Sequence, residues 1–94
     1  MKNSPSKLEA KDKIYKLLQY CRKRKHIPDL HSFVANIKGG RVWVDCGGSE
    51  ISICRVEFST DGGTEKHSTW HFENILKAVD RLAALNMDLD SVSM

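Results

Sequence analysis

The sequence predicts an α+β fold (α-β-β-β-β-α), a four-stranded antiparallel meander with an N-terminal and a C-terminal helix packed on one face. Apolar residues follow the helical period of 3.6 near both ends of the chain and the strand period of 2 in its middle. Glycine pairs divide that middle part into short segments. Sequential strands joined by short turns pair antiparallel, so we expect one small domain over residues 1–94.

The first helix is expected over about residues 6–25. Ser6 and Glu9 fit a capping box, in which each side chain bonds a free backbone N–H at the helix start. Pro28 cannot continue a helix, which sets the end near residue 25. Apolar residues at spacings of three and four form a stripe for burial: Ile14, Leu17, Leu18 and Cys21.

The sheet is expected over about residues 32–72. Three glycine-containing turns divide it: Lys38-Gly39-Gly40, Gly47-Gly48 and Asp61-Gly62-Gly63. In the second strand Val42 and Val44 share one face and Trp43 takes the other. In the third strand Ile51 and Ile53 share one parity, whereas the other parity holds Cys54, Val56 and Phe58. Either both faces are partly covered there or a bulge switches the parity.

The last helix is expected over about residues 73–85. Its buried stripe is predicted to consist of Ile75, Leu76, Val79, Leu82 and Ala83. Asn86 suits a left-handed C-terminal cap. We expect the tail, residues 87–94, to be frayed, with Met87 and Leu89 as the residues able to pack back on the core.

Composition limits the class of protein. The chain of 94 residues lacks an apolar run near the ~20 residues that a membrane span needs. The N-terminus has no apolar segment typical of a secretory signal. The three cysteines are therefore expected to be reduced thiols in a cytoplasmic protein.

Charge is divided unevenly along the chain. Residues 1–26 hold nine Lys or Arg and two acidic residues, whereas the remainder holds six basic and ten acidic residues. This asymmetry favours a polyanionic partner. The run Arg22-Lys23-Arg24-Lys25, with Lys16 one to two turns earlier, is the strongest candidate site. Alternatively, these cations stabilise the dipole of the helix and solvate an exposed face.

Trp43 is a second candidate. If the valines beside it face the helices, Trp43 stands on the open sheet face, where we expect Arg41 and Arg55 beside it. An exposed Trp near Arg can stack on a nucleobase or anchor a protein contact. The alternative is that Trp43 is the buried residue.

Metal and catalytic chemistry are not expected. The spacing of Cys54, His67 and His71 matches half of a two-Cys, two-His zinc finger. Cys46 stands eight positions before Cys54, which breaks the other half, and a hairpin turn replaces the helix of the finger. No nucleophile, base and orienting group are recognisable together, and no phosphate loop is present. We therefore predict no enzyme, no metal and no cofactor.

Two resemblances concern the order of elements alone. The order helix–strands–helix resembles the double-stranded-RNA-binding domain, but the segment 71–77 holds one Lys and one acid where that family has a lysine cluster. This chain also has one strand more. The segment from Gly40 to Leu85 resembles plant-type and integrase arm DNA-binding domains. No diagnostic motif accompanies either resemblance, so the sequence assigns no family.

The sequence thus predicts a small non-enzymatic binding protein that docks on nucleic acid or a nucleoprotein machine through its basic first helix. The alternative is an accessory protein of the phage or mobile-element type, which inhibits or adapts a host protein complex, such as a defence or DNA-processing enzyme, by protein contact. No membrane partner is expected. The binding residues predicted are Lys16, Arg22, Lys23, Arg24, Lys25, Arg41, Trp43 and Arg55.

Overall fold

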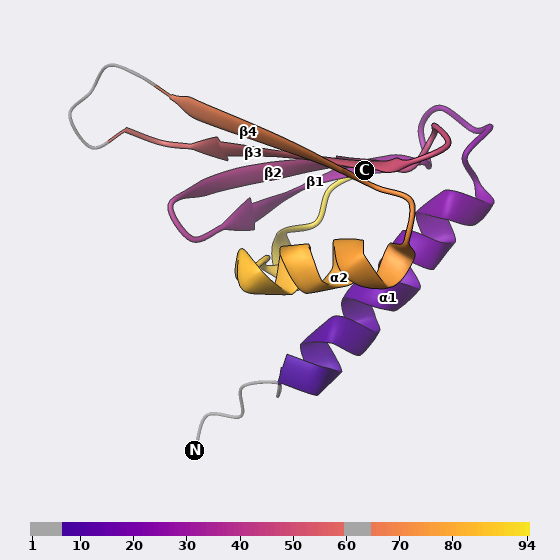
Figure 1. Ribbon diagram of the computed structural model, residues 1–94, viewed down its shortest axis with the longest axis horizontal. Helices are drawn as coiled ribbons and strands as arrows, with labels where there is room; N and C mark the ends of the chain where they lie inside the picture. The colour runs from indigo at the N-terminus through magenta and orange to yellow at the C-terminus, as the bar shows by residue number, and fades with distance from the viewer. Residues whose placement is uncertain (1–6, 60–64) are drawn as a thin grey trace.

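Helices at both ends of the chain cover the same face of one open sheet in the computed structural model, which describes residues 7–59 and 65–94 (Figure 1). The predicted α+β order is confirmed. The elements are α1 (Lys7–Lys23), β1 (Ser32–Ile37), β2 (Gly40–Asp45), β3 (Ile51–Glu57), β4 (Lys66–Phe72), α2 (Ile75–Ala84) and a short 3₁₀ helix η1 (Leu89–Ser91).

The sheet is an antiparallel meander with strand order β1-β2-β3-β4. Its register is continuous, since Val44 lies opposite Phe33 on one side and Ile53 on the other, and Trp43 lies opposite Cys54. The parity of the third strand therefore needs no bulge. Ile51 and Ile53 face the helices, whereas Cys54 and Val56 lie on the open face, so side chains partly cover both faces.

The core lies between the helices and the covered face of the sheet. Side chains of α1 and α2 pack there against apolar residues of β1, β2 and β3. The fully buried members with the largest side chains are Ile14, Leu18, Ile51, Ile53, Leu82, Val42, Val44, Cys21 and Cys46. Three members of the predicted α1 stripe are therefore fully buried, whereas Leu17 is only partly buried against the core, and the predicted parity of β2 is confirmed.

The basic helix ends earlier than predicted. α1 stops at Lys23, and the chain continues in tight turns, in which Arg24 N–H donates to Cys21 O at 3.0 Å and Lys25 N–H to Arg22 O at 3.3 Å. Hydrogen bonds over three residues close the last turn of a helix more tightly than the α-helical pattern. The capping box predicted at Ser6 lies outside the described residues. No helix in the described part of the chain is both long and apolar enough to cross a membrane.

α2 begins at Ile75 because Asn74 caps it. The Asn74 backbone is extended, and its side chain accepts a hydrogen bond from Leu76 N–H at 2.8 Å, which satisfies one free donor of the first turn. The predicted burial of Leu76 is wrong, since this side chain is 59% exposed, and Ala78 is buried instead. The left-handed cap at Asn86 is confirmed by its φ of 57°.

The tail after α2 is ordered against the sheet, so the prediction that it is frayed is wrong. Met87 is buried, and Leu89 packs against the core. Asp88 N–H donates to Asn36 O at 2.8 Å, and Ser93 forms an isolated antiparallel bridge with Val34. Backbone groups on the outer edge of β1 thus hold the tail in place. The turn predicted at Asp61-Gly62-Gly63 lies outside the described residues, whereas Gly39 takes the positive φ of 80° that its turn requires.

The core assignment predicts a large decrease in stability from single truncations. Leu18→Ala and Leu82→Ala each remove a side chain with 0% exposure and should lower the free energy of unfolding by about 2–5 kcal/mol. Urea unfolding followed by circular dichroism measures this change. Leu76→Ala is the matched control on α2, with an expected change below about 0.5 kcal/mol. A change that small for either core variant would show that the assigned helical face is wrong.

Candidate functional site

The predicted basic cluster lies where α1 ends and is held in place by the residue before it. Cys21 is fully buried and packs in the core with Cys46, which follows β2. The two thiols interact there, and each shifts the pKa of the other. This contact joins the last turn of α1 to the sheet and therefore fixes where Arg22–Lys25 emerge.

Arg22 is half-buried and links α1 to the segment before α2. Its Nη1 donates to the carbonyl oxygen of Glu73 at 3.3 Å. Beside it lies an open groove of about 410 Å³, lined by Tyr15, Gln19, Arg22, Lys23, Glu73 and Ile75. The groove therefore presents two cations and an aromatic ring next to one carboxylate.

Arg24 stabilises the end of its own helix. Its Nη1 donates to Tyr20 O at 3.1 Å, and its guanidinium carbon stands 3.7 Å from the centroid of the Tyr20 ring. A basic side chain at a helix C-terminus satisfies a free carbonyl in this way, and stacking on a tyrosine adds a cation–π contact. The capping explanation for the cluster thus holds for Arg24.

The two lysines of the cluster have no such role. Lys23 and Lys25 are exposed, and within the described residues none of the cations from Arg22 to Lys25 forms an ion pair with a carboxylate. Lys16 differs, because its Nζ lies 3.1 Å from Asp12 Oδ2 on the same helix. Four adjacent cations without a carboxylate partner among the described residues therefore lie at the end of α1.

The open face of the sheet holds the second candidate. Trp43 is 46% exposed on this face, so the alternative of a buried Trp43 is wrong. Arg41 lies on the same face, with its guanidinium carbon 5.9 Å from the centroid of the Phe58 ring. Phe58 is itself 51% exposed. Trp43 and Arg41 are thus on one surface, separate from the cluster at the end of α1.

Arg55 does not lie beside Trp43, so this prediction is wrong. It stands opposite Val42 in the register and therefore shares the helix-covered face. Its Nη2 lies 3.3 Å from Glu57 Oε1 and donates to Ser68 Oγ at 3.3 Å. Glu57 therefore compensates the charge of Arg55, whose side chain is largely covered.

The ring of Trp70 contacts two guanidinium groups on this covered face. The guanidinium carbon of Arg55 stands 5.4 Å from the centroid of its ring, and that of Arg81 in α2 stands 4.7 Å away. Cation–π contacts of this kind can stabilise a guanidinium group without a carboxylate partner. Sequence reasoning missed the arrangement, since its three members come from β3, β4 and α2.

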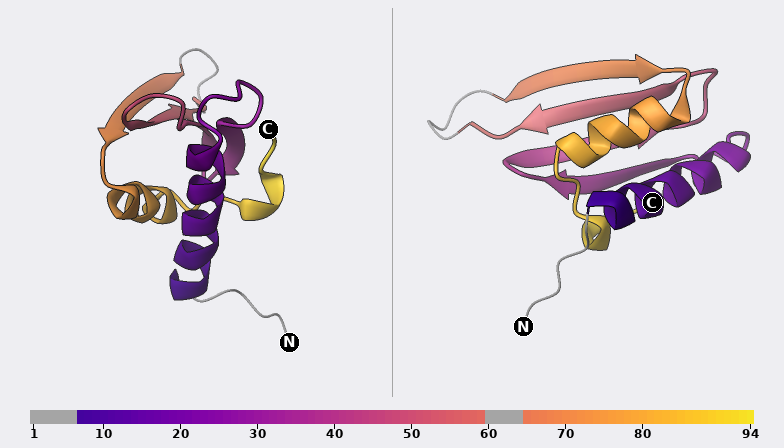
Figure 2. Two further views of the ribbon diagram at one scale, coloured as in Figure 1. Left: turned by 90° about the vertical axis from the view of Figure 1, so that its right-hand side faces the viewer. Right: turned by 60° about the horizontal axis from the view of Figure 1, so that its bottom comes forward.

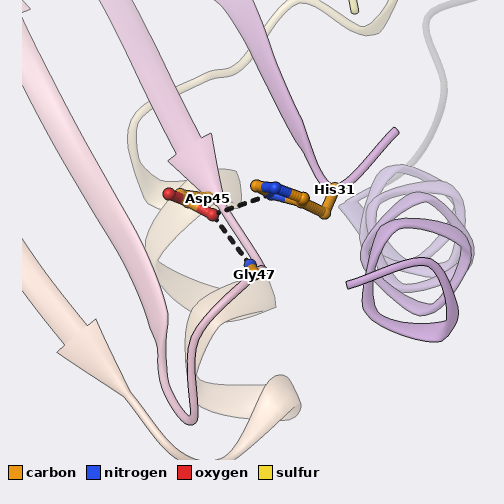
Figure 3. Close-up of polar contacts among 3 residues, drawn as sticks. All are labelled: His31, Asp45 and Gly47. Atoms are coloured by element: carbon orange, nitrogen blue, oxygen red, sulfur yellow. Dashed lines mark hydrogen bonds and ion pairs between the residues drawn. The ribbon is translucent and has the colours of Figure 1, made fainter. Parts of the chain in front are cut away.

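A polar contact next to Cys46 joins the first two strands at the end where α1 arrives. His31 Nδ1 lies 3.1 Å from Asp45 Oδ1, and the same oxygen accepts the Gly47 N–H at 2.7 Å (Figure 3). A Cβ at position 47 would stand 2.7 Å from the His31 ring, so only glycine fits there without movement. The contact orients the connection that follows the basic cluster.

The side chains considered for zinc are divided between the two faces of the sheet. Cys46 is buried toward the helices, whereas Cys54, His67 and His71 lie on the open face. Tetrahedral zinc needs four ligands around one point, and these four residues do not converge. In the described residues no group of three His, Cys, Asp or Glu is placed to hold a metal ion.

One hydroxyl and one imidazole do meet on the open face. Ser52 Oγ and His71 Nδ1 are 3.0 Å apart. A nucleophile and its base also need an orienting group and an oxyanion site. Asp45 lies opposite Ser52, but its Oδ1 is bonded to His31 and Gly47, so the carboxylate is turned toward the strand end.

The pKa values of the two buried thiols are shifted in opposite directions. The hydrogen bond with Cys46 lowers the pKa of Cys21 and outweighs the effect of burial. The same hydrogen bond, together with burial, raises the pKa of Cys46. Cys46 therefore stays protonated at neutral pH, and a protonated thiol is a poor nucleophile.

Comparison with protein-family models, with curated proteins and with solved structures finds no match to this chain.

Thiol accessibility provides a test of this geometry. Cys54 is partly exposed on the open face, whereas Cys21 and Cys46 are buried. A thiol reagent such as 5,5′-dithiobis(2-nitrobenzoate) should modify Cys54 first in the native protein and the other two only after unfolding. In Cys54→Ser the fast phase should disappear. Equal rates for all three thiols in the native state would show that the Cys21–Cys46 contact does not protect them.

Proposed function

We propose that this protein is a non-enzymatic binding protein that docks on nucleic acid, or on a nucleoprotein, through the end of α1. The observation that carries the proposal is the run of four cations, Arg22–Lys25, without carboxylate partners among the described residues. Cations that are not neutralised by the protein can replace the counterions condensed on phosphates. Release of those counterions supplies affinity that does not depend on base sequence.

The four cations have different roles in the proposed binding. Lys23 and Lys25 are exposed and contribute charge to the phosphates. Arg24 keeps donors beyond the one that caps Tyr20 O. Arg22 borders the groove with Tyr15 and Gln19, so a phosphate near Arg22 would have polar side chains within reach. Lys16 belongs to the same helix but is weakened as a contact by its Asp12 partner.

A second candidate function rests on the open sheet face. Exposed Trp and Phe side chains near an Arg are typical of the centre of a protein interface. Trp43 and Phe58 are both about half-exposed, and Arg41 lies against Phe58. In this case the protein would inhibit or adapt a protein complex through the Trp43 face, as an accessory protein does.

The first function is tested by separating local charge from net charge. Lys23→Ser with Lys25→Ser should weaken binding to labelled single- or double-stranded oligonucleotides by an order of magnitude or more at 0.15 M salt. Lys38→Ser with Lys77→Ser, two exposed lysines elsewhere, makes the same change in net charge and should have a much smaller effect. For each phosphate that a variant no longer neutralises, the log–log salt slope should become flatter by roughly 0.7–0.9. Fluorescence anisotropy across several salt concentrations measures both quantities.

Two outcomes would contradict this function. If both double variants weaken binding equally, net charge rather than the end of α1 is responsible. If the wild-type protein does not bind at low salt, direct nucleic-acid binding is excluded, and protein binding through the Trp43 face becomes the favoured function. Affinity purification from the native host with nuclease treatment, repeated with Trp43→Ala, then identifies the protein partner and tests that face.

A further inference from the structure

The two edges of the sheet differ in how their backbone groups are satisfied. On β1, Val34 and Ser93 exchange backbone hydrogen bonds of 2.9 Å, and Asn36 N–H donates to Ser91 Oγ at 2.7 Å. β4 pairs with β3 alone among the described strands. Figure 2 likewise shows no described element along the outer side of β4. One edge is therefore covered by the chain's own tail and the other is open.

The antiparallel register identifies the open backbone groups. Phe58 N–H donates to Gly39 O at 2.9 Å, so alternate residues of β3 from Phe58 backwards point toward β2. The intervening residues, among them Ile53, point toward β4 and meet Lys66, Ser68, Trp70 and Phe72. The N–H and C=O groups of His67, Thr69 and His71 must therefore point outward. The same alternation applied to β1 gives Val34 and Asn36 as its outward residues, and these are the ones bonded to the tail.

β4 lacks the features that usually prevent pairing at an open edge. It contains no proline, its register with β3 is continuous, and Lys66 is its only Lys, Arg, Asp or Glu. Natural sheets protect open edges with proline, bulges, charged side chains or a covering segment. Between the two described edges of this sheet, only β1 has such protection.

We propose that the outer edge of β4 binds a second copy of this chain. The two β4 strands pair antiparallel about a two-fold axis at Thr69, which forms one sheet across both subunits. In this register Thr69 faces the partner's Thr69, and His67 faces the partner's His71. Each such pair exchanges two backbone hydrogen bonds, so the three outward residues of both strands are fully paired. A shift to a neighbouring register leaves some of these groups unpaired.

The placement of charges along β4 and the symmetry of the resulting assembly favour a second copy of the chain over another partner at this edge. Lys66 faces the partner's Phe72 in this register, so no Lys, Arg, Asp or Glu of β4 opposes a like charge. Thr69 is exposed in the subunit, and threonines directly opposite each other on one sheet face can hydrogen-bond. Because the tail covers β1, the paired sheet ends there on both sides, which gives a closed two-fold dimer instead of a fibre.

Substitution of Thr69 by residues of opposite charge tests this arrangement. Thr69→Lys and Thr69→Glu each place two like charges opposite each other and should raise the Kd of self-association by at least about tenfold. An equimolar mixture of the two variants should restore a dimer, because Lys then faces Glu. Sedimentation equilibrium up to about 1 mM protein detects even millimolar association, and circular dichroism verifies that each variant is folded.

Asn36 provides the matched control. It is exposed at the covered edge, and its backbone bonds to the tail do not involve its side chain. Asn36→Lys and Asn36→Glu should leave self-association unchanged. A wild-type protein that stays monomeric up to about 1 mM overturns the proposal. It is also overturned if the Thr69 variants dimerise like the wild type, or if their mixture does not recover.

Discussion

Burial of one face of the sheet is the constraint on which the rest of the structure depends. The continuous register brings Val42, Val44 and Ile53 to the same side, and these side chains leave water only if the helices lie over them. Leu18 and Leu82 supply that cover from the two ends of the chain. The positions of the basic cluster and of Trp43 follow, because the first is tied to a covering helix and the second is left on the opposite face.

The parts of the fold that depend on periodicity were predictable, and those that depend on backbone contacts were not. Alternation in β2 gave the covered face correctly, and helical spacing gave Leu18 and Leu82. Leu76 was misassigned because two overlapping stripes exist in α2, and the small Ala78 lies on the one that is buried. For the tail, Met87 and Leu89 are the side-chain signal, and both pack against the core, whereas the backbone bonds that hold Ser93 to β1 have no signal in the sequence.

The candidate site shows a similar division. The run of cations at the end of α1 was visible in the sequence, but the distinction between Arg24, which caps the helix, and Lys23, which is exposed, depends on contacts. Arg55 shares the parity of Ile53 and could have been assigned to the covered face. Glu57 and the ring of Trp70 explain why the covered face accepts the charge of Arg55.

The bridge between Val34 and Ser93 has a consequence for biosynthesis. The ribosome makes β1 early, whereas the residues that cover its outer edge follow only after the whole sheet and α2. A chain that has formed its meander before the tail docks on β1 therefore exposes two pairing edges. Since exposed edges promote contact between incompletely folded chains, this state is the one most prone to association before folding is complete.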